Sequence, residues 1–159
     1  MTQTIPQLLQ RIARNHPGLP AQYSKDSRGE FLPTTFSRLY QEVLTFAAGL
    51  RSLGIKRGDH VGLVSDNRQE WLVTDLAILS LGAVDVPRGC DSMAGELRYI
   101  LSFADCRTAF LENEAQLRKV LSEKAGLPRL ETLVLFDADF DLSPHATGLA
   151  GMRVLSYRD

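Results

Sequence analysis

The chain contains few of the residues that mark secreted, metal-binding or low-complexity proteins. Among its 159 residues there are two cysteines, Cys90 and Cys106, and neither belongs to a Cys-x-x-Cys pair. This scarcity excludes a disulfide scaffold, and the lack of an adjacent His or Cys cluster excludes a typical zinc site. The 12 glycines and 7 prolines are an ordinary share, which excludes collagen-like sequence.

An excess of charge of one sign is also missing. The 18 basic and 19 acidic residues give a net charge of -1, so nothing points to nucleic acid as a partner. No apolar run approaches the roughly 20 residues that span a bilayer, and the N-terminus has no basic start followed by an apolar stretch. With 44% hydrophobic residues, we expect one compact cytoplasmic domain.

The first third of the chain predicts a helix, a hairpin and a second helix. Thr4 can cap the first helix, and Pro17 ends it. A polar turn at residues 26–29 separates two short strands, 21–25 and 30–33. Thr34 or Thr35 then caps a helix with one apolar stripe, which ends at a C-terminal glycine, Gly54. We assign residues 1–56 to this region and expect it to pack on the remaining core.

From residue 57 onward, short apolar runs alternate with helical patterns. Strands are expected at 60–65, 83–86, 108–111, 132–136 and 152–157, and helices at 68–81, 93–104 and 113–124. Pro87 should stop the second strand, and residues 137–151 should form a polar loop. Such alternation predicts an α/β fold with a doubly wound, mostly parallel sheet and flanking helices over residues 57–159.

The known phosphate-binding and nucleophile motifs are missing. No G-x-G-x-x-G, no G-x-x-x-x-G-K-[ST] and no G-x-S-x-G occurs, and the three histidines fall in separate elements. No catalytic, cofactor-binding or metal-ligating residue is therefore assigned.

One loop is well placed to line a cleft. Residues 87–92 follow a predicted strand, and ligands in open α/β sheets bind beyond the carboxyl ends of strands. Arg88 can hold a phosphate or carboxylate there, whereas Asp91 and Ser92 either line the cleft or cap the next helix. The same two interpretations apply to Asp66 and Asn67 after the preceding strand.

Four segments together resemble the N-terminal portion of adenylate-forming (AMP-binding) acyl-CoA synthetases, most closely the long-chain fatty acid–CoA ligase branch. They are residues 53–61 (LGIKRGDHV), 67–71 (NRQEW), 76–87 (LAILSLGAVDVP) and 96–101 (ELRYIL). The resemblance implies a parent reaction in which fatty acid and ATP form an acyl-adenylate, and CoA then yields acyl-CoA and AMP. ATP, Mg and CoA would serve that longer enzyme, and its remaining chain would be the main partner.

The family's Ser/Thr/Gly-rich ATP loop, followed by Pro-Lys-Gly, does not occur in these 159 residues. We therefore expect a non-catalytic segment that is inactive in isolation, needs no cofactor and can self-associate through exposed apolar surface. The substrate class also makes contact with the inner membrane face plausible. A stand-alone binding or oligomerisation module derived from that family is the alternative, and a small nucleotide-binding α/β enzyme is a third.

Overall fold

The computed structural model describes residues 3–26 and 28–158 and contains two compact units. The first unit comprises Met1–Gly58 and Asn67–Ala83, and the second comprises Asp59–Asp66 and Val84–Asp159. The chain thus enters the second unit for one strand, returns to the first for one helix, and then completes the second. The predicted division into domains 1–56 and 57–159 remains a prediction, because the two units describe which residues contact one another and not which parts fold as domains.

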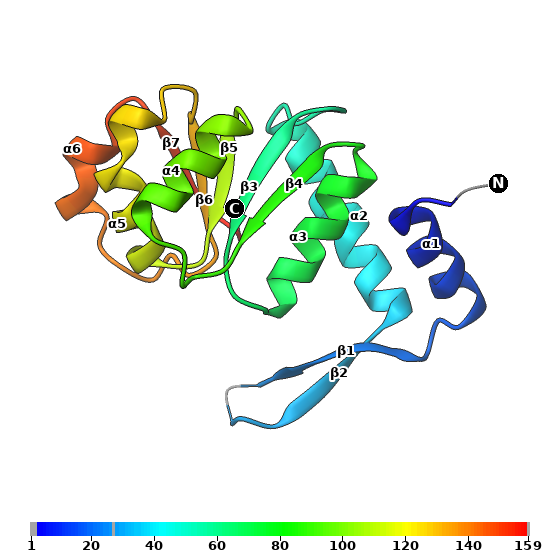
Figure 1. The fold of residues 1–159 in the computed structure, drawn as a ribbon. Helices are drawn as coiled ribbons and strands as arrows, with labels where there is room; N and C mark the ends of the chain where they lie inside the picture. Colours follow the sequence, from blue (N-terminus) through cyan, green and yellow to red (C-terminus); the bar gives the residue numbers. More distant parts are fainter. Residues whose placement is uncertain (1–2, 27, 159) are drawn as a thin grey trace. The chain divides into compact units, whose positions relative to one another are not determined.

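Three helices and a hairpin form the first unit (Figure 1). Helix α1 (Ile5–Asn15) begins as predicted, because the Thr4 side chain accepts a hydrogen bond from the Gln7 backbone and the Gln7 side chain accepts one from the Thr4 backbone. Thr35 caps α2 (Phe36–Ser52), whose buried residues are Leu39, Val43, Ala47 and Leu50. Helix α3 (Gln69–Ser80) follows, with five buried residues.

The predicted hairpin is formed by antiparallel strands β1 (Pro20–Lys25) and β2 (Phe31–Thr35). The Asp26 carboxylate accepts hydrogen bonds from the backbone N–H groups of Arg28 and Glu30, which closes the turn. Ser27, in the same predicted turn, lies outside the described residues.

The second unit is a five-stranded, fully parallel sheet in the order β4-β3-β5-β6-β7 (Figure 1). Its strands are β3 (His60–Val64), β4 (Val84–Arg88), β5 (Thr108–Leu111), β6 (Thr132–Leu135) and β7 (Arg153–Ser156). Strand β4 lies on one side of β3 and the later strands lie on the other, which is the order of a doubly wound sheet. The predicted fold class is confirmed.

Helices α4 (Ala94–Phe103) and α5 (Glu114–Ser122) share one hydrophobic core with the sheet. Leu97 and Leu101 of α4 and Leu117 and Val120 of α5 are almost fully buried in it. Apolar strand residues complete the cluster, among them Val64, Ala109, Leu111, Leu133 and Leu135. Residues of three strands and of two helices thus bury their apolar side chains in the same core, which stabilises this arrangement.

Two predictions for the second unit are wrong, apart from element ends that shift by one or two residues. Pro87 does not stop its strand, because it lies inside β4 opposite Leu63 of β3. Strand β4 lies at one edge of the sheet, and an edge strand tolerates a residue that has no N–H group.

The predicted loop 137–151 also contains structure, namely a 3₁₀ turn (Ser143–His145) and the short helix α6 (Ala146–Leu149). The Lys124 ammonium, in a 3₁₀ turn after α5 (Lys124–Gly126), donates hydrogen bonds to the carbonyls of Gly148 and Ala150. This anchoring by a distant lysine stabilises a segment whose own sequence is polar.

Within the described residues, no helix is long and apolar enough to cross a bilayer.

Candidate functional site

The carboxyl ends of β3, β4 and β5 bring three loops together within the second unit. These loops are residues 65–66, 89–92 and 112–113. The strand order reverses between β3 and β5, and open α/β sheets bind their ligands at such a switch point. This edge is therefore the place where the topology favours a functional site.

Glu112 joins the loop after β5 to the loop after β3. Its Oε2 atom accepts hydrogen bonds from the Ser65 hydroxyl and from the Asp66 backbone N–H, each at 2.8 Å. Ser65 is 4% exposed, so its hydroxyl needs a protein acceptor. The carboxylate of Glu112 thus holds two loops that lie 47 residues apart in the chain.

Asp66 extends the same network to the loop after β4. Its Oδ1 atom accepts a 2.9 Å hydrogen bond from the Cys90 backbone N–H, and the Ser65 N–H donates to the Arg88 carbonyl. The prediction that Asp66 or Asn67 caps the next helix is wrong, since the N-cap of α3 is Arg68 and no side chain caps it.

Lys119 of α5 holds the loop after β4 through backbone carbonyls. Its ammonium donates to the carbonyls of Cys90 and Ser92, at 2.6 and 2.9 Å. Sequence reasoning missed both Glu112 and Lys119. The position of Glu112 directly after a strand could have indicated that it lies at the carboxyl edge. The residues near Lys119 in the sequence, in contrast, give no indication of the carbonyls that it contacts.

The three predicted cleft-lining residues all lie at this edge. Arg88 ends β4 and is exposed, Asp91 is exposed, and Ser92 is half-buried. Neither Asp91 nor Ser92 caps α4; its N-cap is Met93, whose backbone N–H donates to the Glu96 carboxylate. Ligand contact by Arg88, Asp91 and Ser92 remains a prediction.

The loop after β4 is closely packed at its glycine. A Cβ atom at Gly89 would lie 2.7 Å from Oδ1 of Asp91 and 3.6 Å from Oδ1 of Asp66. A Cβ atom at this position would therefore displace the Asp91 carboxylate.

Comparison with known proteins decides the family. The family model described as AMP-binding enzyme matches residues 9–151, which is most of the chain. The chain belongs to the AMP-binding enzyme family. The resemblance predicted from the four sequence segments is thereby confirmed.

Several relatives that this AMP-binding chain matches are named as long-chain fatty acid ligases. A chloroplastic long-chain-fatty-acid–[acyl-carrier-protein] ligase of Arabidopsis thaliana is 35% identical over 104 residues, which cover 65% of this chain and 14% of the relative. A long-chain-fatty-acid–CoA ligase of Mycobacterium tuberculosis is 30% identical over 112 residues, covering 70% of this chain and 19% of the relative. The chain therefore spans less than a fifth of these relatives.

Solved structures agree on the fold. An acetoacetyl-CoA synthetase from Streptomyces lividans matches with a TM-score of 0.76 at 22% identity, covering 96% of this chain and 24% of that one. The adenylation domain of a carboxylate reductase from Mycobacterium chelonae matches with a TM-score of 0.75 at 21% identity, covering 99% and 28%.

The cluster of Asp66, Cys90 and Glu112 in this AMP-binding chain offers magnesium only two oxygen ligands, both already used in hydrogen bonds. Ligand atoms of Asp66, Cys90 and Glu112 lie within 4.8 Å of one another, but both carboxylates already accept hydrogen bonds from the loops. Burial, with the nearby Glu112 charge adding to it, raises the pKa of the Cys90 thiol to about 11. A neutral thiol is a poor ligand, and Mg²⁺ requires oxygen atoms.

The same loops offer few free groups to the phosphates of ATP, and the exposed Arg88 is the cation that remains for an anion at this edge. A phosphate cradle needs free N–H groups and cations, whereas the Lys119 ammonium is used on two carbonyls and the Cys90 N–H on Asp66. Three carboxylates, those of Asp66, Asp91 and Glu112, would repel a polyphosphate further. Hydrogen bonds at this edge thus serve to hold the loops.

Proposed function

We propose that this chain is the N-terminal, non-catalytic segment of a long-chain fatty acid–CoA ligase. The match of residues 9–151 to the AMP-binding family, together with relatives named as long-chain fatty acid ligases, carries the proposal. The parent enzyme would use ATP, Mg and CoA to convert a fatty acid into acyl-CoA through an acyl-adenylate. The segment itself would bind none of these tightly, since most polar groups of its loops are used in hydrogen bonds within the protein.

Its contribution would be to supply a preformed wall of the cleft. The loops after β3, β4 and β5 are held by the Glu112, Asp66 and Lys119 hydrogen bonds, so their geometry would not depend on substrate. Arg88, Asp91 and Ser92 would then face the substrates from this edge.

The remainder of the synthetase chain would be the main partner. Tyr99 and Phe103 on α4 stack at 5.9 Å between ring centroids and are 64% and 79% exposed. Paired exposed aromatic rings favour association, so in the isolated chain this face would support self-association.

We further propose a cytoplasmic location with peripheral contact at the inner membrane face.

Two assays test the proposal. The 159-residue chain should show no fatty-acid-dependent ATP–pyrophosphate exchange, and measurable exchange would refute the non-catalytic role.

In the second assay, residues 9–151 replace the matched segment of the mycobacterial long-chain-fatty-acid–CoA ligase. The chimera should still form acyl-CoA from long-chain fatty acids, with the unmodified ligase as control. A chimera that folds by circular dichroism but makes neither acyl-adenylate nor acyl-CoA would contradict the proposal.

A further inference from the structure

The β1–β2 hairpin of the first unit forms a two-stranded sheet of its own (Figure 1). Among the described residues, no third strand pairs with either β1 or β2. Such a hairpin is marginally stable alone, because the backbone groups on its two outer edges have no strand to pair with. A free edge is therefore a surface to which a strand of another chain can bind.

The hydrogen-bond register shows which residues lie along the outer edge of β1. The Asp26 N–H donates to the Glu30 carbonyl, so these two residues form a hydrogen-bonded pair across the hairpin. Bonded and non-bonded pairs alternate in an antiparallel ladder, so Ser24 also turns its backbone groups toward β2. Tyr23 and Lys25 then turn theirs away from β2. No hydrogen bond joins these outward groups to described residues outside the hairpin.

The two outer edges of the hairpin differ in their ability to pair. Pro33 of β2 lies opposite Tyr23, a non-bonded position at which its nitrogen faces outward. Because proline has no N–H group, a strand added beside β2 would lose a ladder hydrogen bond there. The only proline of β1 is Pro20, at the start of the strand and before the register shift that precedes Gln22. Residues 22–26 therefore form an open edge, whereas the edge of β2 is interrupted.

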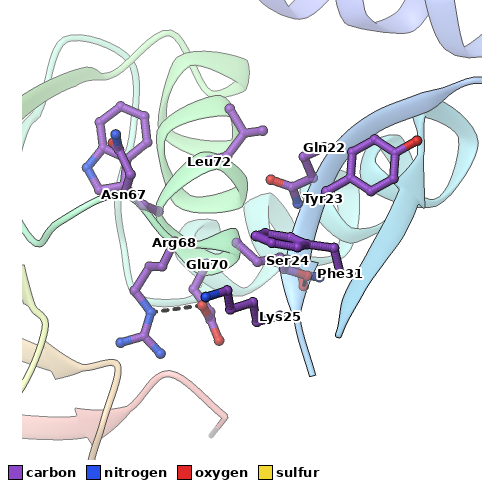
Figure 2. A pocket seen from close by; sticks show the side chains of 11 residues that line it. Gln22, Tyr23, Ser24, Lys25, Phe31, Asn67, Arg68, Glu70 and Leu72 are labelled. Atoms are coloured by element: carbon purple, nitrogen blue, oxygen red, sulfur yellow. Dashed lines mark hydrogen bonds and ion pairs between the residues drawn. The ribbon is translucent and has the colours of Figure 1, made fainter. Parts of the chain in front are cut away.

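The space beside β1 is open to a second strand. A pocket of about 670 Å³ is lined by four consecutive residues of β1 but only by Phe31 of β2 (Figure 2). Helix α3 contacts the hairpin from one face, where the Ser24 hydroxyl donates to the Gln69 side chain. Figure 2 shows the Gln22 side chain on this face and the Tyr23 ring on the opposite one. Tyr23 is 59% exposed, so the strand edge between the two faces is accessible.

We propose that β1 pairs in antiparallel fashion with β1 of a second copy of this chain, about a two-fold axis at Ser24. Tyr23 of each copy then lies opposite Lys25 of the other, and the outward N–H and C=O groups of both residues enter the new ladder. An aromatic ring opposite a cation is a favourable cross-strand pair, whereas two opposed lysines would repel each other. Asp26 lies opposite Gln22 of the other copy, so like charges do not meet in this register.

The paired sheet would be closed to further copies. Its strand order would be β2-β1-β1-β2, so both of its outer edges would be β2 strands interrupted at Pro33. A two-fold interface uses the same surface on each copy, and the assembly therefore stops at a dimer. The register shift between Pro20 and Gln22 limits the new ladder to residues 22–26. For so short an interface we expect a dissociation constant of about 10 μM to 1 mM.

This surface is separate from the exposed rings of Tyr99 and Phe103 on α4. It is also independent of the proposed ligase function, because it uses only the hairpin of the first unit.

Amide hydrogen exchange followed by NMR tests the pairing in the original chain. Exchange is measured at protein concentrations below and above the dissociation constant, and sedimentation velocity gives the number of copies at each. In the dimer, the N–H groups of Tyr23 and Lys25 should exchange at least about tenfold more slowly than in the monomer. Those of Gln22 and Ser24, which already face β2, should exchange at similar rates at both concentrations.

Three variants locate the interface. Lys25→Pro removes an outward N–H that the hairpin itself does not use, and should weaken dimerisation at least about tenfold. Lys25→Met retains this N–H and should stay within about threefold of the original chain, since a cross-strand pair contributes little. Phe103→Ser removes the exposed ring on α4 and should leave dimerisation unchanged. Circular dichroism shows whether each variant folds.

A chain that stays monomeric at every concentration would overturn the proposal. So would a dimer in which the Tyr23 and Lys25 N–H groups exchange as fast as in the monomer, a folded Lys25→Pro that dimerises normally, or a Phe103→Ser that no longer dimerises. If Lys25→Pro does not fold, the exchange rates of the original chain decide the question. The measurements use no ATP, CoA or fatty acid, so a negative result would leave the proposed ligase function untouched.

Discussion

Removing the Glu112 carboxylate should loosen the loops at the carboxyl edge and lower the free energy of unfolding. In Glu112→Ala, the Ser65 hydroxyl exchanges a charged acceptor for the Asp66 carbonyl, which lies 2.9 Å away, at a cost of about 1 kcal/mol. The Asp66 N–H exchanges the same carboxylate for water, at a further cost of about 1 kcal/mol, because Asp66 is exposed. We expect a total loss of about 2 kcal/mol.

Urea unfolding followed by circular dichroism measures this loss, and thermal unfolding should show a decrease in Tm of about 4–8 °C for a chain of this length. Glu112→Gln retains an uncharged acceptor and should lose about half as much. The control is Glu131→Ala, which breaks a 2.6 Å ion pair to Arg107 whose side chains are both more than half exposed, and should change stability by less than about 0.5 kcal/mol. Equal effects of Glu112→Ala and Glu131→Ala would refute the reasoning.

Three further predictions concern other parts of the chain. Gly62→Ala places a Cβ atom 2.5 Å from a methyl carbon of Leu101 and should destabilise the chain by about 1–3 kcal/mol in urea unfolding. The control is Gly95→Ala in α4, where the added Cβ meets open space and should stabilise the chain slightly. The Cys90 thiol, with its pKa raised to about 11, should react with iodoacetamide far more slowly at neutral pH than a free cysteine, and its rate should rise with pH up to that value; a fast reaction by mass spectrometry would contradict this. Hydrogen bonds from backbone N–H groups, that of Glu30 contributing most, lower the pKa of Asp26 below its ordinary value of 3.8. Asp26→Asn should therefore be less stable than the original chain at neutral pH, and this difference in stability should vanish as the pH falls through the folded-state pKa.

Elements with local signals could be predicted well from the sequence. Thr4, Thr35 and Asn113 cap their helices as expected, because a side chain and the N–H groups it serves are only two or three residues apart. Strand β5 has the predicted bounds, since its three apolar residues are all buried in the sheet. The prediction that Pro87 ends its strand is wrong, because the effect of a proline depends on whether its strand lies at an edge, which is a property of the whole sheet.

The candidate site could be located from the sequence but not described. The rule that ligands bind beyond strand ends singles out Arg88, Asp91 and Ser92, which lie at the carboxyl edge of the sheet, and their contact with a ligand remains a prediction. The alternative interpretation, that Asp66, Asp91 or Ser92 caps a helix, is wrong, since the N-caps are Arg68 and Met93. Asp66 instead accepts a hydrogen bond from a backbone N–H 24 residues away.

The sequence by itself determined the alternation of strands and helices, the helix caps and the family, because periodicity, capping and motif spacing are read over a few neighbouring residues. Only the tertiary structure decided which side chains hold the loops. Ser65 and Glu112 are 47 residues apart, and Cys90 and Lys119 are 29 apart. These pairs meet only because parallel strands end at a common edge, and strand order is set by the burial of the whole sheet rather than by any single segment.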